Sequence, residues 1–286
     1  MTHRRWFGSK SRSITNLEIF ETIAVQAAEN TFILLATVTY SEGEPDTYLL
    51  PVRIVDTCED ETALLCQLQY EDGSQALLID ACHDKAAADA LLDLIRRESA
   101  IEGSDGILRG IRTLAFSDSG DLSPALWRRE GSNSSIAYGD QLMLKLFRRP
   151  EVGVNPDWEL GRYLTEEAKY SHVPDTAGGL EYTDRRGKVR TIGLLQRLVP
   201  NTGDARQLFF GGLRDYFTKA ATVPNSEFGE LRNDSSLEAC DPPALAHELF
   251  GDALRHATLL GQRTAELHLA LAAGRDTSFA PKAFTP

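Results

Sequence analysis

Residues 138–149 have the sequence Tyr-Gly-Asp-Gln-Leu-Met-Leu-Lys-Leu-Phe-Arg-Arg, and residues 153–166 have the sequence Gly-Val-Asn-Pro-Asp-Trp-Glu-Leu-Gly-Arg-Tyr-Leu-Thr-Glu. The first stretch predicts a strand over 142–148, paired with 135–138 through the turn Gly139-Asp140. Alternation along that strand puts Lys145 on one face and the leucines on the other. Burying a lysine without a partner is costly. Lys145 is therefore either a phosphate-binding residue or an edge-strand lysine that points to solvent.

The flanking segments favour phosphate binding. Residues 155–169 predict a helix, because Asn155 can cap it and Pro156 suits its first turn. Phosphoryl transfer uses a loop of small residues, a strand lysine and a helix glutamate in this order. We expect Glu159 to orient Lys145, with Glu151 and Glu166 as alternatives. The predicted phosphate loop comprises Ser132, Asn133, Ser134 and Ser135. A simple turn is the alternative for this loop. The flanking Arg128-Arg129 and Arg148-Arg149 could help to attract ATP, although we expect them to lie at solvated strand ends.

The rest of the chain divides into three predicted parts. Residues 1–105 form a small α+β unit, residues 106–200 a second sheet with one helix, and residues 201–286 a mostly helical part. Strand patterns in the first two parts cover residues 31–40, 47–55, 61–68, 77–82, 107–116 and 189–198. Helix patterns cover residues 85–97 and 243–273. The second of these helices would span roughly 45 Å.

Two further segments carry predictions. Residues 196–201 follow a predicted buried strand, and there Gln196 and Leu198 could offer backbone groups to an adenine ring. A strand end followed by a proline turn is the alternative. Near the N-terminus, we expect Trp6 and Phe7 to anchor the first segment to its core, with the neighbouring basic residues paired to carboxylates.

Composition excludes several classes of protein. The net charge of −12 argues against a nucleic-acid partner. No apolar run approaches the roughly 18–20 residues that a membrane span needs, so we expect a cytoplasmic protein. The cysteines fit no zinc pattern and are expected to be reduced and structural; they are Cys58, Cys66, Cys82 and Cys240. No His-Glu-x-x-His motif occurs, and we expect no metal site within these residues.

Four separated segments resemble the bacterial maltokinases, including the modules fused to trehalose synthase. Residues 132–166 resemble the family's nucleotide-binding region. Residues 4–12 are similar to its N-terminal cap signature, residues 195–204 to its hinge, and residues 260–271 to the long helix before its catalytic loop. After the hinge, residues 204–206 lack the Gly-Trp of the family, which puts contacts at that point in doubt.

The resemblance implies a protein-kinase-like (aminoglycoside-phosphotransferase-like) α+β fold behind an N-terminal α+β cap. It implies transfer of the ATP γ-phosphate to maltose with Mg²⁺, with Lys145 binding phosphate. The family's His-Gly-Asp catalytic loop and its metal-binding aspartate have no counterpart in this sequence. We therefore expect the catalytic and metal-binding aspartates beyond Pro286, a truncated C-terminal helical lobe, and no activity of this chain alone.

Other functions remain open. The chain could be a non-catalytic nucleotide-binding module or one that docks onto trehalose synthase. It could also self-associate through an unfinished helical face. A third possibility keeps the kinase and changes the acceptor to another sugar, such as glucosamine.

Overall fold

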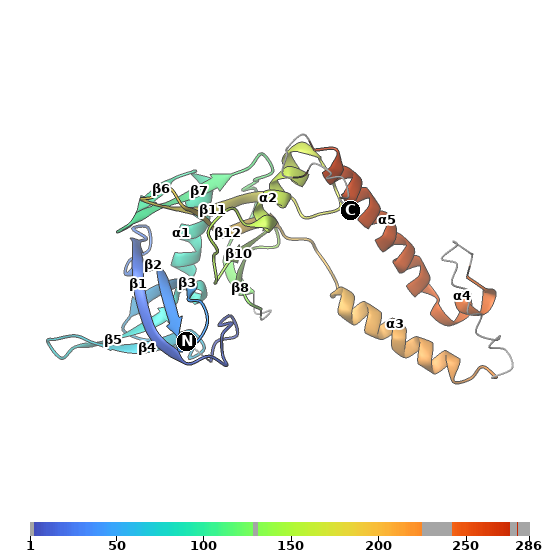
Figure 1. The fold of residues 1–286 in the computed structure, drawn as a ribbon, viewed down its shortest axis with the longest axis horizontal. Helices are drawn as coiled ribbons and strands as arrows, with labels where there is room; N and C mark the ends of the chain where they lie inside the picture. The colour runs from blue at the N-terminus through green and yellow to red at the C-terminus, as the bar shows by residue number, and fades with distance from the viewer. Residues whose placement is uncertain (1–2, 128–130, 225–241, 275–278, 280–286) are drawn as a thin grey trace. The chain divides into compact units, whose positions relative to one another are not determined.

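The computed structural model describes residues 3–127, 131–224, 242–274 and 279. The chain divides into two compact units, Met1–Val199 and Pro200–Pro286, and each is described by itself. Figure 1 shows the two antiparallel sheets of the first unit and the helices of the second. Cys240, Arg128-Arg129 and the C-terminal residues 280–286 lie outside the described residues, and the other three cysteines are free thiols.

The first sheet has five antiparallel strands in the order β1-β2-β3-β5-β4. They are β1 (Ile14–Ala24), β2 (Thr31–Tyr40), β3 (Asp46–Val55), β4 (Leu64–Gln69) and β5 (Gln75–Asp80). The strands expected over 31–40 and 47–55 are confirmed. The strand expected over 77–82 ends at Asp80, whose carboxylate accepts the Cys82 N–H and starts the 3-10 turn η1 (Ala81–His83). Strand β1 was not predicted, because its first six residues are exposed and lack an apolar alternation.

Helix α1 (Lys85–Arg96) follows and confirms the helix expected over 85–97. The Asp84 carboxylate caps its first turn by accepting the Ala87 N–H. The apolar face of α1 packs on the second sheet at very close range. A Cβ atom at Gly110 would lie 2.1 Å from the Leu94 carbonyl oxygen, so only glycine permits this approach.

The second sheet has seven strands in the order β6-β7-β11-β12-β10-β9-β8. They are β6 (Ala100–Glu102), β7 (Gly106–Arg112), β8 (Pro124–Trp127), β9 (Ser134–Tyr138), β10 (Leu142–Leu146), β11 (Thr176–Asp184) and β12 (Val189–Arg197). Strand β10 pairs with β9 on one side and with β12 on the other. The edge-strand interpretation of Lys145 is therefore wrong, since β10 lies inside the sheet.

A single apolar core joins the two sheets. It contains Ile23, Ile33 and Leu35 from the first sheet, the buried face of α1, and residues of the second sheet such as Leu144 and Leu180. A smaller cluster holds Trp6 and Phe7, with the Phe7 and Tyr48 rings stacked 5.1 Å apart. The prediction that these two aromatic residues anchor the first segment is confirmed.

The basic residues beside Trp6 and Phe7 follow the predicted pairing with carboxylates only in part. Arg4 donates to the backbone carbonyl groups of Thr62 and Leu64 rather than to carboxylates. Arg12 donates to the Glu42 and Glu44 carbonyl groups and lies 4.0 Å from the Asp46 carboxylate. Backbone carbonyl groups therefore accept from Arg4 and Arg12, and Arg12 also has a carboxylate within ion-pair distance.

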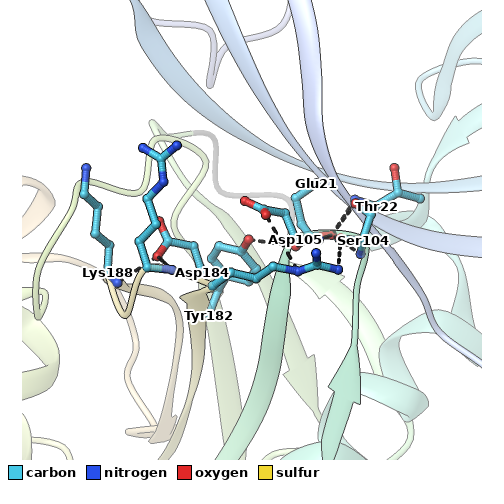
Figure 2. Close-up of polar contacts among 9 residues, drawn as sticks. Glu21, Thr22, Ser104, Asp105, Tyr182, Asp184 and Lys188 are labelled. Carbon is cyan, nitrogen blue, oxygen red and sulfur yellow. Dashed lines mark hydrogen bonds and ion pairs between the residues drawn. The ribbon is translucent and has the colours of Figure 1, made fainter.

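A buried carboxylate also ties the sheets together. Glu21 on β1 is fully buried and accepts the Tyr182 hydroxyl of β11 at 2.7 Å (Figure 2). It also accepts the backbone N–H groups of Thr22, Ser104 and Asp105, the last two from the turn between β6 and β7. Burial raises the pKa of Glu21, but these hydrogen bonds outweigh burial and leave the pKa below its ordinary value.

The second unit consists of helices α3 (Ala205–Ala220), α4 (Ala244–Phe250) and α5 (Asp252–Ala272). The single helix expected over 243–273 is wrong. Gly251 separates α4 from α5 with φ 49° and ψ −123°, a conformation that side-chain-bearing residues rarely adopt. The 21 residues of α5 span about 32 Å instead of the longer length expected. In the part of the chain that the structure describes, no helix is long and apolar enough to cross a membrane.

Candidate functional site

A groove of about 630 Å³ lies where the first sheet meets the loops around β10. One side is lined by Pro45 of the β2–β3 connection and by Asp46 and Thr47 at the start of β3. The other side comprises Ser132, Asn133, Lys145, Phe147, Arg149, Pro150, Glu151, Val152, Asn155, Pro156, Asp157 and Arg190. Two residues of the predicted phosphate loop and the predicted phosphate lysine therefore share one groove.

Lys145 projects from the middle of the second sheet. Its strand neighbours in register are Ser135 on β9 and Leu194 on β12. The leucines of β10 are buried, whereas Lys145 is one-third exposed, as the alternation predicted. Its ammonium group lies 2.6 Å from the Asp157 carboxylate and 5.2 Å from the centre of the Phe147 ring. The site thus holds a partly desolvated cation with one counter-ion.

The partner of Lys145 is Asp157, and the expected pairing with Glu159 is wrong. Both residues lie on α2 (Pro156–Arg162), whose N-cap is Asn155 as predicted. Residues two positions apart on an α-helix point about 200° apart, so only one of them can face Lys145. Burial of Trp158 at 1% exposure, with its indole N–H donating to Glu181, fixes the rotation of α2 that selects Asp157.

The two alternative glutamates lie elsewhere. Glu166 pairs with Arg162 at 3.2 Å, within the π-helical turn η2 (Tyr163–Glu167) that continues α2. The helix expected over 155–169 is therefore an α-helix followed by this wider turn. Glu151 lines the groove but stands outside the Lys145 pair.

The predicted phosphate loop is shorter than expected. Ser134 and Ser135 belong to β9, and only Ser132 and Asn133 line the groove. The Ser134 hydroxyl accepts a hydrogen bond of 2.8 Å from the Arg148 Nε–H. Arg148, expected at a solvated strand end, is instead only 1% exposed and pairs with Asp80 at 2.5 Å. Its partner is 68 residues away, so no local sequence pattern could indicate that Arg148 is buried.

Arg149 brings a second cation to the groove. Its guanidinium lies 2.5 Å from the Asp46 carboxylate, which also accepts the Tyr40 and Ser9 hydroxyl groups. Burial raises the pKa of Asp46, but the two hydroxyl groups and Arg149 outweigh burial and leave the pKa below its ordinary value. Asp46 is thus ionised at neutral pH, and it holds Arg149 at the groove. Pattern reasoning missed Asp46, because one aspartate at a strand start carries no distinguishing signal.

The predicted hinge residues Gln196 and Leu198 lie at the end of β12, beside the start of β10. Gln196 pairs in register with Met143 on β10, two positions from Lys145. The Leu198 N–H donates to the Gln141 carbonyl at 2.7 Å. Neither residue lines the groove. The sheet spacing separates Met143 from Lys145 by about 7 Å along one face.

Ionisable side chains do not gather into a metal site in the described ranges. No group of three or more His, Cys, Asp or Glu residues there could hold a metal ion. The groove itself combines the cations Lys145, Arg149 and Arg190 with the carboxylates of Asp46, Glu151 and Asp157. A site with both kinds of charge suits an anionic ligand, because the ligand can take the place of a carboxylate as the partner of a lysine.

Comparison with known proteins finds a family match for the N-terminal part of the chain. Residues 1–84 match the family described as the maltokinase N-terminal cap domain, so the N-terminal part of the chain is maltokinase-like. This range covers the whole first sheet and ends at the residue that caps α1.

Solved structures of glucosamine kinases share the fold. One, in complex with glucosamine, ADP and inorganic phosphate, aligns with a TM-score of 0.50 and 12% identity, over 94% of this chain and 49% of that chain. Another, in crystal form B, aligns with a TM-score of 0.50 and 14% identity over the same shares. These matches establish a kinase-like α+β fold, and the chain spans about half the length of the glucosamine kinases.

Proposed function

Starting from a maltokinase-like N-terminal part on a kinase-like fold, we propose that this chain is the cap and ATP-binding part of a carbohydrate kinase. The proposed reaction transfers the γ-phosphate of ATP to maltose and gives maltose 1-phosphate, in trehalose and α-glucan metabolism in the cytoplasm. The observation that carries the proposal is the groove shared by Ser132, Asn133 and Lys145. In the proposed kinase, residues 1–105 form the cap, residues 106–200 form the ATP-binding lobe, and residues 201–286 form the start of the helical lobe.

The groove residues divide the work of holding ATP. Lys145 and Arg149 would bind the phosphate oxygens, and the small residues Ser132 and Asn133 would let backbone N–H groups approach them. Asp157 would orient Lys145. Adenine would lie toward Met143, where the strand end carrying Gln196 and Leu198 offers backbone groups. Ser134 and Ser135 would support the loop from β9.

Mg²⁺ is part of the proposal through the nucleotide. When bound, it would neutralise charge on the phosphate oxygens. The described residues offer no cluster of three metal-ligating side chains, and the metal-binding aspartate is expected beyond Pro286. The carboxylates nearest to the proposed phosphates are those of Asp157, Glu151 and Asp46.

Calorimetry of the chain with Mg-ATP tests the nucleotide site. We expect binding, and Lys145→Ala should weaken it at least tenfold, because the loss of a charge-assisted contact costs about 1.5–3 kcal/mol. Lys188→Ala is the matched control, since this exposed lysine lies in the β11–β12 turn outside the groove. A well-folded chain without affinity for Mg-ATP would refute the proposal.

The acceptor and the turnover need separate assays. The sequence contains no His-Gly-Asp segment, so we expect these 286 residues alone to form no maltose 1-phosphate above a blank. Detection of the product by mass spectrometry would overturn this expectation. Supplying glucosamine in place of maltose tests the main alternative acceptor.

An interaction module is the second candidate, and the second unit favours it. Its α3 and α4 expose large apolar side chains around a hollow of about 450 Å³. The exposed Leu208, Phe209, Leu213 and Phe250 line the hollow, and α3 also exposes Phe210 and Phe217 outside that lining. Such a surface suits self-association or docking onto trehalose synthase. Light scattering of the chain alone and with that enzyme tests this, and a monomer that ignores the enzyme argues against it.

A further inference from the structure

The buried Arg148 connects the first sheet to the start of the candidate phosphate loop. Its Nε–H donates to the Ser134 hydroxyl, and Ser134 directly follows the groove residues Ser132 and Asn133. Its Nη2 donates to the Asp80 carboxylate at 2.5 Å and lies 3.3 Å from the Cys82 sulfur. The Trp6 ring centre lies 4.7 Å from the guanidinium carbon.

The residues that make these contacts come from two different regions of the chain. Trp6, Asp80 and Cys82 belong to the region before α1, whereas Ser134 begins β9 of the second sheet and Arg148 lies two residues after the end of β10. In addition, the Arg148 carbonyl accepts the Leu49 N–H at 2.9 Å, two residues beyond the groove residue Thr47. A fully paired buried arginine holds a planar, rigid geometry, so the position of Ser134 is set by the first sheet.

We propose that Arg148 is a positioning residue through which Asp80 of the cap fixes the phosphate loop for nucleotide binding. This inference rests on the proposed function of the groove. Arg148 does not line the groove and touches no ligand there; it acts by holding Ser134. A lysine could not take the role of Arg148, because a single ammonium group does not have the forked guanidinium geometry that reaches Ser134 and Asp80 together.

A second buried carboxylate provides a matched control. Glu21, like Asp80, is almost fully buried and ties the first sheet to the second. Its partners Ser104, Asp105 and Tyr182 lie outside the groove. Asp80→Asn and Glu21→Gln therefore both remove a buried charge between the sheets, but only Asp80→Asn loosens the support of Ser134. A purely structural role would make the two variants equivalent.

The experiment measures hydrogen exchange and Mg-ATP affinity in the full chain. In Asp80→Asn, we expect the backbone N–H groups of residues 132–135 to exchange several-fold faster without nucleotide, and the Kd for Mg-ATP to rise roughly tenfold, the size of one charge-assisted hydrogen bond. Glu21→Gln should leave the Kd for Mg-ATP at the wild-type level, and it should speed exchange at residues 132–135 by no more than its loss of global stability accounts for. Ser134→Ala should reproduce the effect, and the double variant should add little to it.

The outcomes separate the two proposals. Unchanged exchange at residues 132–135 in a folded Asp80→Asn variant, or an equal change in Glu21→Gln, would overturn the positioning role. If Asp80→Asn does not fold, Ser134→Ala decides by the same exchange measurement, and unchanged exchange rejects the role. A wild-type chain that does not bind Mg-ATP would defeat the proposed nucleotide site, while the exchange data would still judge whether the cap fixes the loop.

Discussion

Charged side chains in the first unit have two distinct environments. Glu21, Asp80 and Arg148 are buried, and their hydrogen bonds connect the region before α1 to the region of the second sheet. Lys145 and Arg149 are part-exposed around the groove, each beside one carboxylate. Removing one partner of a buried set leaves an uncompensated polar group, whereas part-exposed pairs contribute little to stability. Stability and ligand binding therefore depend on different residues within a few positions of sequence.

Glu21 should make folding sensitive to acid. Its folded pKa lies below the ordinary value of about 4.3, so its contribution is present above that pH and is lost as the pH falls through the folded pKa. We expect Glu21→Gln to lower the free energy of unfolding at pH 7 by about 1.5–3 kcal/mol. Its stability should also fall less steeply than that of the wild type below about pH 4.3.

Urea denaturation at several pH values between neutral and acid measures this difference. Glu102→Gln is the control, because Glu102 is exposed on β6. Parallel pH curves for wild type and Glu21→Gln would show that the buried carboxylate does not titrate as argued.

The choice of residues at the site shows where sequence reasoning stops. The strand alternation was sufficient to place Lys145 on the less buried face of β10. It could not select Asp157 over Glu159, because that depends on the rotation of α2, which Trp158 sets by packing on the sheet. Asp80 and Arg148 pair across 68 residues, and no local pattern reports such a contact.

At the scale of elements, the strands that could be predicted are those whose composition is typical of a strand. Strand β2 is rich in β-branched and aromatic residues, and its predicted limits match the structure. Strand β11 was missed, because Ala177-Gly178-Gly179 lowers its strand propensity even though its residues are buried. These glycines serve packing: a Cβ atom at Gly178 would lie 2.5 Å from the Ile95 side chain of α1.

The close contact between α1 and β7 gives a prediction for elements. Gly110→Ala should destabilise the first unit by about 1–3 kcal/mol, because the new methyl group would push α1 off the sheet. Gly211→Ala is the matched substitution in α3, where nothing lies within 4 Å of the added atom. That change should increase helical content, since alanine favours a helix by about 0.5–1 kcal/mol over glycine.

Thermal unfolding and circular dichroism of the two variants measure these effects. An unchanged melting temperature for Gly110→Ala would mean that α1 can move away from β7 at little cost.

At the scale of the whole molecule, the two units differ in how much apolar surface they bury. All three core clusters lie between Trp6 and Leu195. Helices α3 and α5 contain no buried residue, and Leu249 of α4 is the single buried hydrophobic residue among the described residues of the second unit. Burial of apolar surface is the main source of folding stability. Most of the stability of the chain therefore comes from the first unit.

A chain ending at Val199 should therefore unfold cooperatively, within about 2–4 °C of the full chain, a shift that corresponds to roughly 1 kcal/mol. Residues 200–286 alone should show helical signal without a cooperative transition. Differential scanning calorimetry of the three proteins checks this. A much lower melting temperature for the shortened chain would show that the helices support the sheets.

The bond between Glu21 and Tyr182 spans 161 residues, which has a consequence for synthesis on the ribosome. At about 5–20 residues per second, Tyr182 is made roughly 8–30 s after Glu21. Throughout that interval the emerging N-terminal strands expose an ionised carboxylate and the apolar surface that α1 and the later strands will cover. The nascent first sheet cannot complete its core alone. The N-terminal third of the chain therefore stays accessible to chaperones until β11 has been synthesised.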